Sequence, residues 1–272
     1  MIGAWGSMVM ETAIAASDNL SIPACGIAVM AKASLPGHSK TRLVPPLTCE
    51  EAAHCNTAFL RDVGDNILAA ATHASIAGYV AFGPPQTRPF FEQNLPREIG
   101  LIEAWYPSLG DCLVSAITQL LQRGHVGAVV LNADSPTLPT SLLIEAAETL
   151  ACPGERIVLG PADDGGYYLL GMKAMHRRLF QDIAWSTEQV ARQTLARAAE
   201  LDLSVHVLPK WYDVDDVGAL RMLRSELFEG RSFLRELRPH GARHSRALMQ
   251  SLLETSGLND RLACSEFRRA AE

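Results

Sequence analysis

Residues 126–136 have the sequence VGAVVLNADSP, the most hydrophobic strand-like run of the chain, which ends close to an acidic residue. A continuous apolar run of this kind is typical of a strand buried on both faces of a parallel sheet. Helical patterns lie on either side of it, from about residue 110 to 122 and from about residue 140 to 151. Strands that alternate with helices of this length predict βαβ units and a largely parallel sheet.

The alternation extends toward the N-terminus. GIAVMAKA (26–33) is a second apolar run, and it ends at a Pro-Gly turn. A Thr cap, acids in the first turn and apolar spacing near 3.6 predict a helix over 48–72. Further strand patterns follow at 74–83 and 101–106.

The pattern changes after residue 156. The apolar runs RIVLG and YYLLGM are joined by PADDGG, a sequence typical of a hairpin or a tight return. A helix at 186–200, a strand at 203–209 and a final helix from about Val217 complete the pattern. The predicted fold class is therefore α/β, with a mixed, mostly parallel central sheet.

The composition argues against several classes of protein. The chain has 272 residues, with 24 Lys and Arg against 30 Asp and Glu, a formal charge of −6 and 48% hydrophobic residues. This apolar content is ample for a core, and a charged fraction of 20% argues against disorder. No apolar run approaches the ~18 residues of a membrane-spanning helix, and the acidic balance argues against binding nucleic acid through bulk charge. We expect an enzyme-like domain with no nucleic acid and no stable membrane insertion.

The two ends of the chain differ from its centre. Residues 1–24 contain no Lys or Arg, and Glu11 and Asp18 interrupt their apolar pattern. They are interpreted as an N-terminal extension or a mis-chosen start rather than a signal peptide. Residues 25–230 would form the catalytic domain. Residues 231–272 would form an Arg-rich helical tail, either a solvated cover or an oligomer contact, with anionic membrane or nucleic-acid binding as the alternative.

The cysteines suggest a cellular compartment. Six cysteines are scattered along the chain without a Cys-x-x-Cys pair. This distribution indicates buried thiols in a reducing cytosol rather than a disulfide framework or a sulfur-bound metal. The predicted location is the cytoplasm.

Three cations follow the first predicted strand within eleven residues: Lys32, Lys40 and Arg42. Like charges on a short loop repel one another unless an anion lies between them, and a di- or triphosphate would meet that requirement. Pro36 and Gly37 form the turn, and Gly37 would let the backbone approach the phosphate. The second glycine of a Walker A loop is missing. An ordinary solvated basic turn is the alternative.

Acidic residues follow other strands. A carboxylate at Asp134 suits Mg²⁺ or Mn²⁺, and capping of the next turn is the alternative. In WYDVDD (211–216), Asp213 or Asp215 would join Asp134 on one ion. A phosphatase motif is disfavoured because this segment comes late and leads into a helix, for which Asp216 is the expected N-cap.

Asp163 and Asp164 precede Gly165 and Gly166 in the predicted hairpin turn. Turn chemistry alone can explain two acids before two glycines. The functional alternative is a loop whose glycines admit a sugar or an acceptor, while Asp164 binds a hydroxyl group or acts as a base.

Five separated motifs, in this order, resemble a known family. They are A-K-x-x-x-P-G-x-x-K-T-R-L, A-D-S-P-x-L, L-G-P-A-x-D-G-G-Y-Y-L-L-G, W-S-T (185–187) and W-Y-D-V-D. Over roughly residues 26–225 the chain resembles the bacterial glycosyltransferase A-type proteins loosely assigned to arsenosugar biosynthesis, a family long catalogued as a domain of unknown function. That family is similar in fold to nucleotidyltransferases such as the phospholactate guanylyltransferases.

The resemblance implies a three-layer, Rossmann-like glycosyltransferase A fold, the fold of nucleotide-diphospho-sugar transferases. The nucleotide and phosphate positions it implies are Lys32, Pro36, Gly37, Lys40 and Arg42. The metal positions are Asp134, Asp213 and Asp215. The sugar or acceptor positions are Asp163, Asp164, Gly165, Gly166, Tyr167, Trp185, Ser186 and Thr187. One position departs from the family, because its usual L-G-x-R-M is Leu109-Gly-Asp-Cys-Leu113 here, with Cys112 in place of Arg.

The predicted function is metal-dependent transfer from a nucleotide-diphosphate donor to a small-molecule acceptor. Asp164, Lys40 and Arg42 are the predicted catalytic residues, and Mg²⁺ or Mn²⁺ is the predicted cofactor. The loop with a single glycine favours a sugar donor and hence a glycosyltransferase. A nucleotidyltransferase that uses a nucleoside triphosphate and a non-catalytic nucleotide-binding module are the alternatives.

Overall fold

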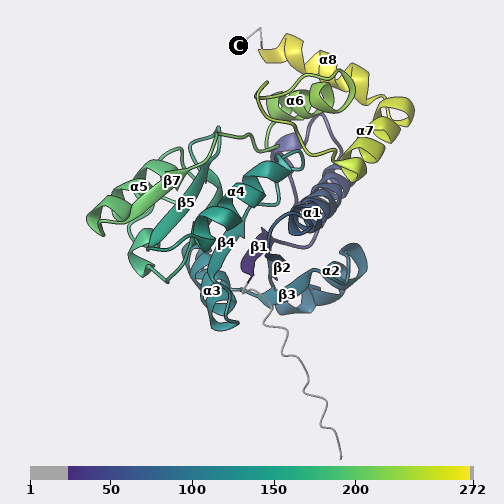
Figure 1. Cartoon of the computed structure of the whole chain (residues 1–272). Coiled ribbons are helices and arrows are strands. Elements are labelled where there is room, and N and C mark those ends of the chain that lie inside the picture. Colours follow the sequence, from purple (N-terminus) through teal and green to yellow (C-terminus); the bar gives the residue numbers. More distant parts are fainter. Residues whose placement is uncertain (1–23, 270–272) are drawn as a thin grey trace, which may run out of the picture.

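Seven strands form one sheet in the order β3-β2-β1-β4-β6-β5-β7. The computed structural model describes residues 24–269, shown in Figure 1. The strands are β1 Cys25–Ala31, β2 Ile76–Phe82, β3 Gly100–Glu103, β4 Gly127–Leu131, β5 Arg156–Pro161, β6 Tyr167–Met172 and β7 Ser204–Val207. The helices are α1 Cys49–Ala71, α2 Arg88–Asn94, α3 Leu109–Gln122, α4 Thr140–Ala151, α5 Val190–Glu200, α6 Val217–Phe228, α7 Arg243–Thr255 and α8 Leu258–Arg269.

The sheet is mixed and mostly parallel. β6 runs antiparallel to both of its neighbours, β4 and β5, whereas the other pairs are parallel. The hairpin predicted from RIVLG and YYLLGM is therefore confirmed. Because β6 is reversed, its amino end lies at the same sheet edge as the carboxyl ends of β1, β4 and β5.

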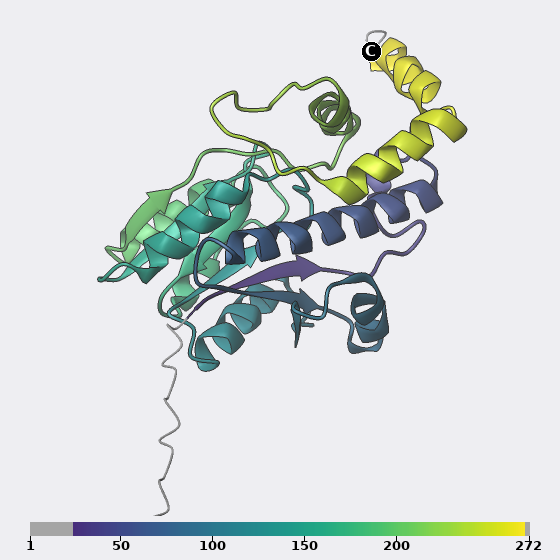
Figure 2. The same ribbon diagram turned by 45° about the vertical axis from the view of Figure 1, so that its right-hand side comes forward.

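Helices cover both faces of the sheet and give three layers. One core lies between the sheet and α1, α4 and α2, and the other lies between the sheet and α3 and α5. Figure 2 shows α1 along one face of the sheet, with α7 lying on its outer side. The predicted three-layer α/β class is confirmed.

Most predicted elements are present, with local differences. Thr48 caps α1 through a capping box with Glu51, as the sequence predicts. The helix expected over 186–200 begins only at Val190, because the preceding residues form a turn in which Ser186 has a φ of 63°. The short helix α2 has no counterpart among the predictions.

The C-terminal helices are attached to α1 by charged groups. The carboxylate of Asp62 accepts hydrogen bonds from the amides of His244 and Ser245 at 2.8 Å each, and so caps the first turn of α7. The guanidinium of Arg243 lies 2.7 Å from Asp65 on the same face of α1. At the other end of α1, Arg261 of α8 donates to both carboxylate oxygens of Glu51, at 2.8 Å each.

The ion pair between Glu51 and Arg261 gives a stability prediction. Hydrogen bonds from Arg261 hold the pKa of the Glu51 carboxyl below its ordinary value. Its contribution is therefore present above the unfolded-state pKa, near 4.5, and is lost as pH falls through the lower folded value. We expect Glu51→Gln to lower the free energy of unfolding by about 1 to 2 kcal/mol at pH 7, and by less at pH 3.

Urea unfolding at both pH values measures this difference. Glu50→Gln is the matched control, because Glu50 is an exposed acid in the same helical turn. A loss of equal size for the two variants at pH 7 would contradict the role assigned to the ion pair.

The cysteines differ in part from the prediction. The five described cysteines are free, but only Cys25 and Cys55 are buried, and Cys152 is exposed. Residues 1–23, most of the predicted N-terminal extension, lie outside the described residues. Among residues 24–269, no helix combines the length and hydropathy needed to cross a membrane.

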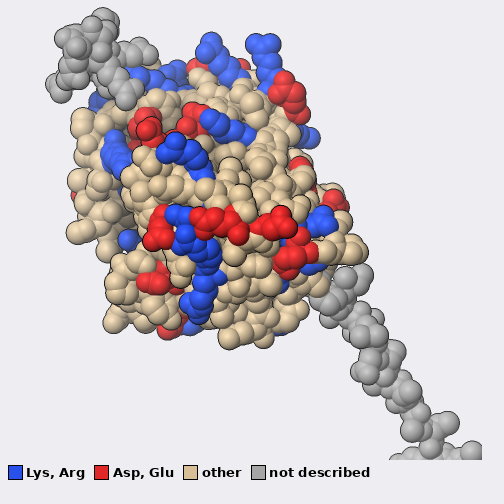
Figure 3. All heavy atoms as spheres, turned by 90° about the vertical axis from the view of Figure 1, so that its left-hand side faces the viewer, with Lys and Arg blue, Asp and Glu red and all other residues tan. Residues whose placement is uncertain are grey.

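The face that carries α5 and β7 is charged but mixed in sign. Figure 3 shows Lys and Arg side chains beside Asp and Glu side chains on this face. One cluster joins Arg178 to Asp182 and to Glu200, the latter at 2.8 Å, and Arg197 also pairs with Glu200. The charges of this cluster therefore largely neutralise one another.

Candidate functional site

The carboxyl edge of the sheet brings together segments that lie far apart in the sequence. β1 leads into Lys32, β4 leads into Asp134, and the turn between β5 and β6 carries Asp164 at the same edge. The amide of Val214 donates to the carbonyl of Asp134 at 2.9 Å, which fixes the late acidic segment there. In open α/β sheets this edge is the usual position of a ligand site.

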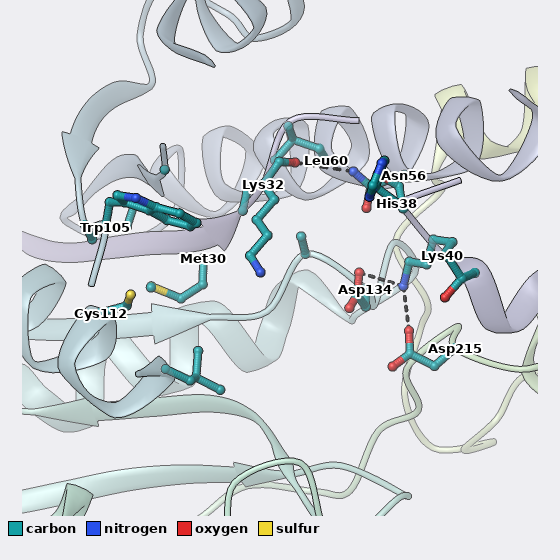
Figure 4. Close-up of a pocket in the computed structure, with 18 of the residues that line it drawn as sticks. Met30, Lys32, His38, Lys40, Asn56, Leu60, Trp105, Cys112, Asp134 and Asp215 are labelled. Atoms are coloured by element: carbon teal, nitrogen blue, oxygen red, sulfur yellow. Dashed lines mark hydrogen bonds and ion pairs between the residues drawn. The ribbon is translucent and has the colours of Figure 1, made fainter. Parts of the chain in front are cut away.

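Two adjoining compartments form a cleft at this edge. The first, here called the cationic compartment, has a volume of about 420 Å³ and is lined by Lys32, His38, Lys40, Arg42 and Trp105, among others. Figure 4 shows Trp105 and Met30 at one end, Asp134 and Asp215 at the other, and Lys32 extending between them. A site with several cations beside an aromatic surface suits an anionic ligand that carries a planar ring.

Lys40 lies at the centre of the acidic groups instead of pointing freely into the cleft. Its ammonium group is 2.6 Å from Asp134 and 2.7 Å from Asp215, and it donates to the carbonyl of Val214 at 3.0 Å. Burial alone would lower the pKa of Lys40, but the two carboxylates hold it above its ordinary value. Lys40 therefore bridges the two acids and ties the first loop to the last one.

The second compartment, here called the acidic compartment, has a volume of about 460 Å³. It shares Arg42, Asp134 and Asp215 with the cationic compartment, so the two are parts of one cleft. Its own lining includes Asp164 and Glu188.

Asp213 also lines the acidic compartment. Its carboxylate accepts hydrogen bonds from Asn132 and Ser135, both at 2.6 Å. Burial raises the pKa of the Asp213 carboxyl to about 7 because the charged form loses its water. The nearby carboxylates of Asp134 and Asp164 add to this rise, so the three acids converge.

Two buried aromatic residues hold the acidic segment in place. Trp211 is fully buried, and its amide donates to the carbonyl of Pro161 at 3.1 Å. The hydroxyl of Tyr212 donates to Glu226 of α6 at 2.7 Å. Asp216 accepts from the amide of Ala219 at 2.8 Å, so it is the N-cap of α6, as predicted. The buried residues Tyr212 and Val214 alternate with Asp213 and Asp215, which turns the two carboxylates toward the cleft.

The turn before β6 depends on Gly165. Gly165 has a φ of +89°, and a Cβ built there would lie 2.3 Å from the backbone oxygen of Glu188. The carbonyl of Gly165 accepts from the amide of Ala191 at 3.0 Å. The turn and the start of α5 therefore pack backbone against backbone, and this contact sets the position of Glu188.

We expect Gly165→Ala to lower the free energy of unfolding by about 2 to 4 kcal/mol, through backbone strain and the clash with Glu188. Gly124→Ala is the matched control, because Gly124 has a φ of +88° and a Cβ there would meet no atom within 4 Å. Chemical denaturation of both variants measures the two losses, and we expect the control to lose only about 1 to 2 kcal/mol. If the two variants lose the same free energy of unfolding, the close approach of the added Cβ to Glu188 does not destabilise the protein.

The structure does not bring every predicted residue to the cleft. Pro36 and Gly37 are exposed and lie outside the lining of both compartments. Asp163 lies at the rim, with its carboxylate 3.5 Å from Lys210. Of the positions predicted for the sugar or acceptor, six line the acidic compartment: Asp164, Gly166, Tyr167, Trp185, Ser186 and Thr187. Gly165 supports the turn without lining that compartment.

Several lining residues were not predicted from the sequence. They are Trp105, His38, Asn132 and Glu188. Ser135 lines neither compartment but donates to Asp213. Asn132 directly follows β4, so the rule that ligands bind at carboxyl ends of strands would have found it. Trp105 lies inside the strand predicted over 101–106, but β3 ends at Glu103 and leaves Trp105 beyond the strand. Cys112 lines the cationic compartment, so its departure from the family pattern falls within the site.

Asp134 and Asp215 could hold a divalent cation if the ammonium group of Lys40 moved away from them. Asp134 and Asp215 converge on one point, and carboxylate oxygens are ligands that Mg²⁺ and Mn²⁺ prefer. That point is taken by the ammonium of Lys40, so a metal ion would have to displace it. Elsewhere, Asp62, Asp65 and His244 form a group that could hold a metal, but Asp62 and Asp65 already bind the start of α7.

Comparison with known proteins supports the fold. The family model described as "Uncharacterized protein conserved in bacteria (DUF2064)" matches residues 66–187. A crystal structure from Desulfovibrio desulfuricans G20, provisionally described as a nucleotide-diphospho-sugar transferase, has a TM-score of 0.73 at 24% identity. The match covers 89% of this chain and 99% of that one. The chain therefore has the fold of that protein, which confirms the fold predicted from the resemblance.

Two other structures are less similar. A cytidylyltransferase from Leptospira borgpetersenii serovar Hardjo-bovis has a TM-score of 0.48 at 10% identity, over 87% of this chain and 97% of that one. CMP:2-keto-3-deoxy-manno-octonic acid synthetase, complexed with CTP, has a TM-score of 0.48 at 12% identity, over 76% and 100%. Similarity this low carries no argument about function. No curated protein sequence matches the chain.

Proposed function

We propose that this protein is a metal-dependent transferase that acts on a nucleotide-diphosphate donor, and specifically a glycosyltransferase that uses a nucleotide sugar. The observation that carries the proposal is the division of one cleft into a cationic and an acidic compartment. The cationic compartment suits a diphosphate, and the acidic compartment suits a hydroxyl-bearing group. The fold shared with the Desulfovibrio protein agrees with this assignment, as does the resemblance to proteins assigned to arsenosugar biosynthesis.

The donor would bind with its diphosphate beside Lys32 and Arg42. Both side chains line the cationic compartment, and Arg42 also lines the acidic one. Arg42 therefore lies where the leaving diphosphate and the acceptor would meet. A fixed positive charge at that point stabilises the negative charge that develops on the leaving group.

Asp164 is the proposed base. Its Oδ1 accepts from the amide of Gly166 at 2.8 Å, which orients the carboxylate in the acidic compartment. The acceptor oxygen would form a bond to the anomeric carbon while the bond from that carbon to the phosphate oxygen breaks. The acceptor proton would pass to Asp164, and the electron pair of the broken bond to the nucleoside diphosphate.

A divalent ion held by Asp134 and Asp215 would neutralise charge on the diphosphate. Asp213 is placed to support this pair through its hydrogen bonds with Asn132 and Ser135. The proposed location is the cytoplasm, where the free thiols of the described cysteines would stay reduced.

The proposal is tested by calorimetry with UDP, GDP and their glucose conjugates, with and without Mn²⁺, followed by product analysis. We expect metal-dependent binding of one nucleotide, and release of the nucleoside diphosphate when an acceptor is added. Release of pyrophosphate from a nucleoside triphosphate would identify a nucleotidyltransferase instead. Binding without any turnover would identify a nucleotide-binding module.

The base of the nucleotide has a candidate platform in Trp105. This side chain is 51% exposed, and a Cβ built at Gly83 would lie 2.6 Å from its ring, so the indole rests on the Gly83 backbone. Stacking of a base on an aromatic ring contributes about 1 to 3 kcal/mol, so we expect Trp105→Ala to weaken nucleotide binding about tenfold. Tyr106→Ala is the control, because Tyr106 is 50% exposed but does not line the cleft. Equal affinities for the two variants, measured by calorimetry, would remove Trp105 from the site.

A further inference from the structure

The acidic compartment holds negative charge that Lys40 does not neutralise. Lys40 pairs with Asp134 and Asp215, whereas Asp164 and Glu188 lie farther along the compartment. Of the described residues that line it, Arg42 is the only Lys or Arg, and it stands at the junction with the cationic compartment. Arg192 lines a smaller adjoining pocket together with Asp164 and Glu188, but it does not line this compartment. A phosphate or carboxylate group placed inside the compartment beside the two acids would therefore be repelled.

Two buried polar atoms of the same compartment have no hydrogen-bond partner. They are the hydroxyl of Tyr167 and the side-chain oxygen of Asn132, and both residues line the compartment. The amide nitrogen of Asn132 donates to Asp213 at 2.6 Å, which leaves its oxygen as a free acceptor. Asn132 directly follows β4, and Tyr167 is the first residue of the neighbouring β6. The amide of Asn132 donates to the carbonyl of Tyr168 at 2.9 Å.

An unsatisfied donor and an unsatisfied acceptor both suit hydroxyl groups. A hydroxyl group can accept from the Tyr167 hydroxyl, and a hydroxyl group can donate to the Asn132 oxygen. An ionised phosphate or carboxylate cannot donate to Asn132, because it is an acceptor only. Buried polar groups without partners are costly, and a bound hydroxyl would remove that cost.

The remaining wall of the compartment is apolar and aromatic. A Cβ built at Gly110 would lie 3.1 Å from the indole of Trp185, so this ring is held against α3. Leu109 and Leu113 continue the same wall. A flat aromatic surface opposite a few polar groups suits a ring with one apolar face and several hydroxyl groups.

We propose that the acidic compartment binds an uncharged polyhydroxylated acceptor, whose hydroxyl groups hydrogen bond to Tyr167 and to Asn132. This inference rests on the proposed function, in which the cationic compartment holds the nucleotide. It goes beyond that function by specifying the acceptor as a sugar or cyclitol without phosphate or carboxylate groups.

Ligand-observed saturation-transfer NMR on the full chain tests the inference, with UDP present to fill the cationic compartment. The probes are glucose and myo-inositol, each compared with its monophosphate. We expect transfer to the uncharged probes and several-fold weaker transfer to the phosphate esters. Tyr167→Phe should weaken binding of the uncharged probes about three- to tenfold, the loss expected for one hydrogen bond.

Tyr167→Phe also carries an internal check on folding. It removes a buried hydroxyl that has no partner, so we expect a melting temperature equal to or above that of the unmodified protein. Tyr106→Phe is the matched control, because that exposed ring lies outside the compartment, and it should leave probe binding unchanged. Glu188→Lys should increase binding of the phosphate esters.

Three results would overturn the inference: phosphate esters that bind as well as the uncharged probes, unchanged probe binding in Tyr167→Phe, or no transfer to either uncharged probe. The UDP resonances in the same sample report separately on the cationic compartment, with GDP substituted in a parallel sample. Probe binding without binding of either nucleotide would refute the proposed function but support the assignment of the acidic compartment.

Discussion

Asp134→Asn is expected to slow transfer roughly 10²- to 10³-fold and to abolish the metal-dependent part of nucleotide affinity. A ligand that contributes ~3 to 4 kcal/mol of transition-state stabilisation accounts for a loss of that size. The substitution keeps the shape of the side chain but removes the charge that faces Lys40 at 2.6 Å. Asp215 still pairs with Lys40 at 2.7 Å, so the loop that carries Lys40 should stay in place.

The measurement is a calorimetric titration of nucleotide with and without Mn²⁺, alongside an assay of transfer. Asp182→Asn is the matched control, because Asp182 is 70% exposed, pairs with Arg178 and does not line the cleft. We expect it to keep both activity and affinity. If Asp134→Asn retains the full effect of Mn²⁺ on nucleotide affinity, Asp134 is not a metal ligand.

The convergence of the site could be predicted because it depends on backbone topology. Apolar runs locate β1 and β4, and the residues that follow them, Lys32 and Asp134, must then share an edge of the sheet. The turn at Asp164 reaches that edge only because β6 is antiparallel, and the PADDGG sequence predicted that reversal. Local turn chemistry and strand pattern were sufficient for these positions.

The partners of individual side chains could not be predicted in the same way. Lys40 was grouped with Lys32 and Arg42 by charge and spacing, but its ammonium pairs with Asp134 and Asp215. Lys40 has a φ of 51°, a left-handed conformation that is uncommon for a residue with a side chain. That local conformation, together with contacts across 175 positions of sequence, decides where the side chain lies. No local pattern encodes it.

The unpredicted lining residues have a similar explanation. Trp105 is an ordinary apolar residue in the sequence, and it reaches the cleft because Gly83 lets its ring approach the backbone. Gly110 does the same for the ring of Trp185, a position that the family resemblance had predicted. Glu188 is placed by its backbone contact with Gly165. Such positions depend on pairs of residues from separate elements, so they become visible only once the fold is known.

Lys40→Met is expected to destabilise the metal-free protein and to strengthen its binding of Mn²⁺. The side chain of Lys40 is only 5% exposed, and its removal leaves Asp134 and Asp215 facing each other without a cation. The side chains of Asp134 and Asp215 are 33% and 40% exposed, so water screens the repulsion between their carboxylates. We expect the free energy of unfolding to fall by about 2 kcal/mol, less than for a fully buried pair.

Mn²⁺ should restore much of this loss, because the ion can then occupy the point between the carboxylates without displacing an ammonium group. The increase in melting temperature caused by Mn²⁺ should therefore be larger in Lys40→Met than in the unmodified protein, and calorimetry should show tighter binding of the ion. Lys32→Met is the matched control, since Lys32 is an exposed cation of the same cleft, and we expect it to leave both quantities nearly unchanged.

The experiment distinguishes two roles for Lys40. If Lys40 competes with the metal ion, Mn²⁺ affinity must rise when the ammonium group is removed. If Lys40 instead holds the carboxylates in the geometry that the ion requires, Mn²⁺ affinity must fall together with stability. The distances from Lys40 to both carboxylates place its ammonium at the point where the ion would bind, and this geometry favours competition.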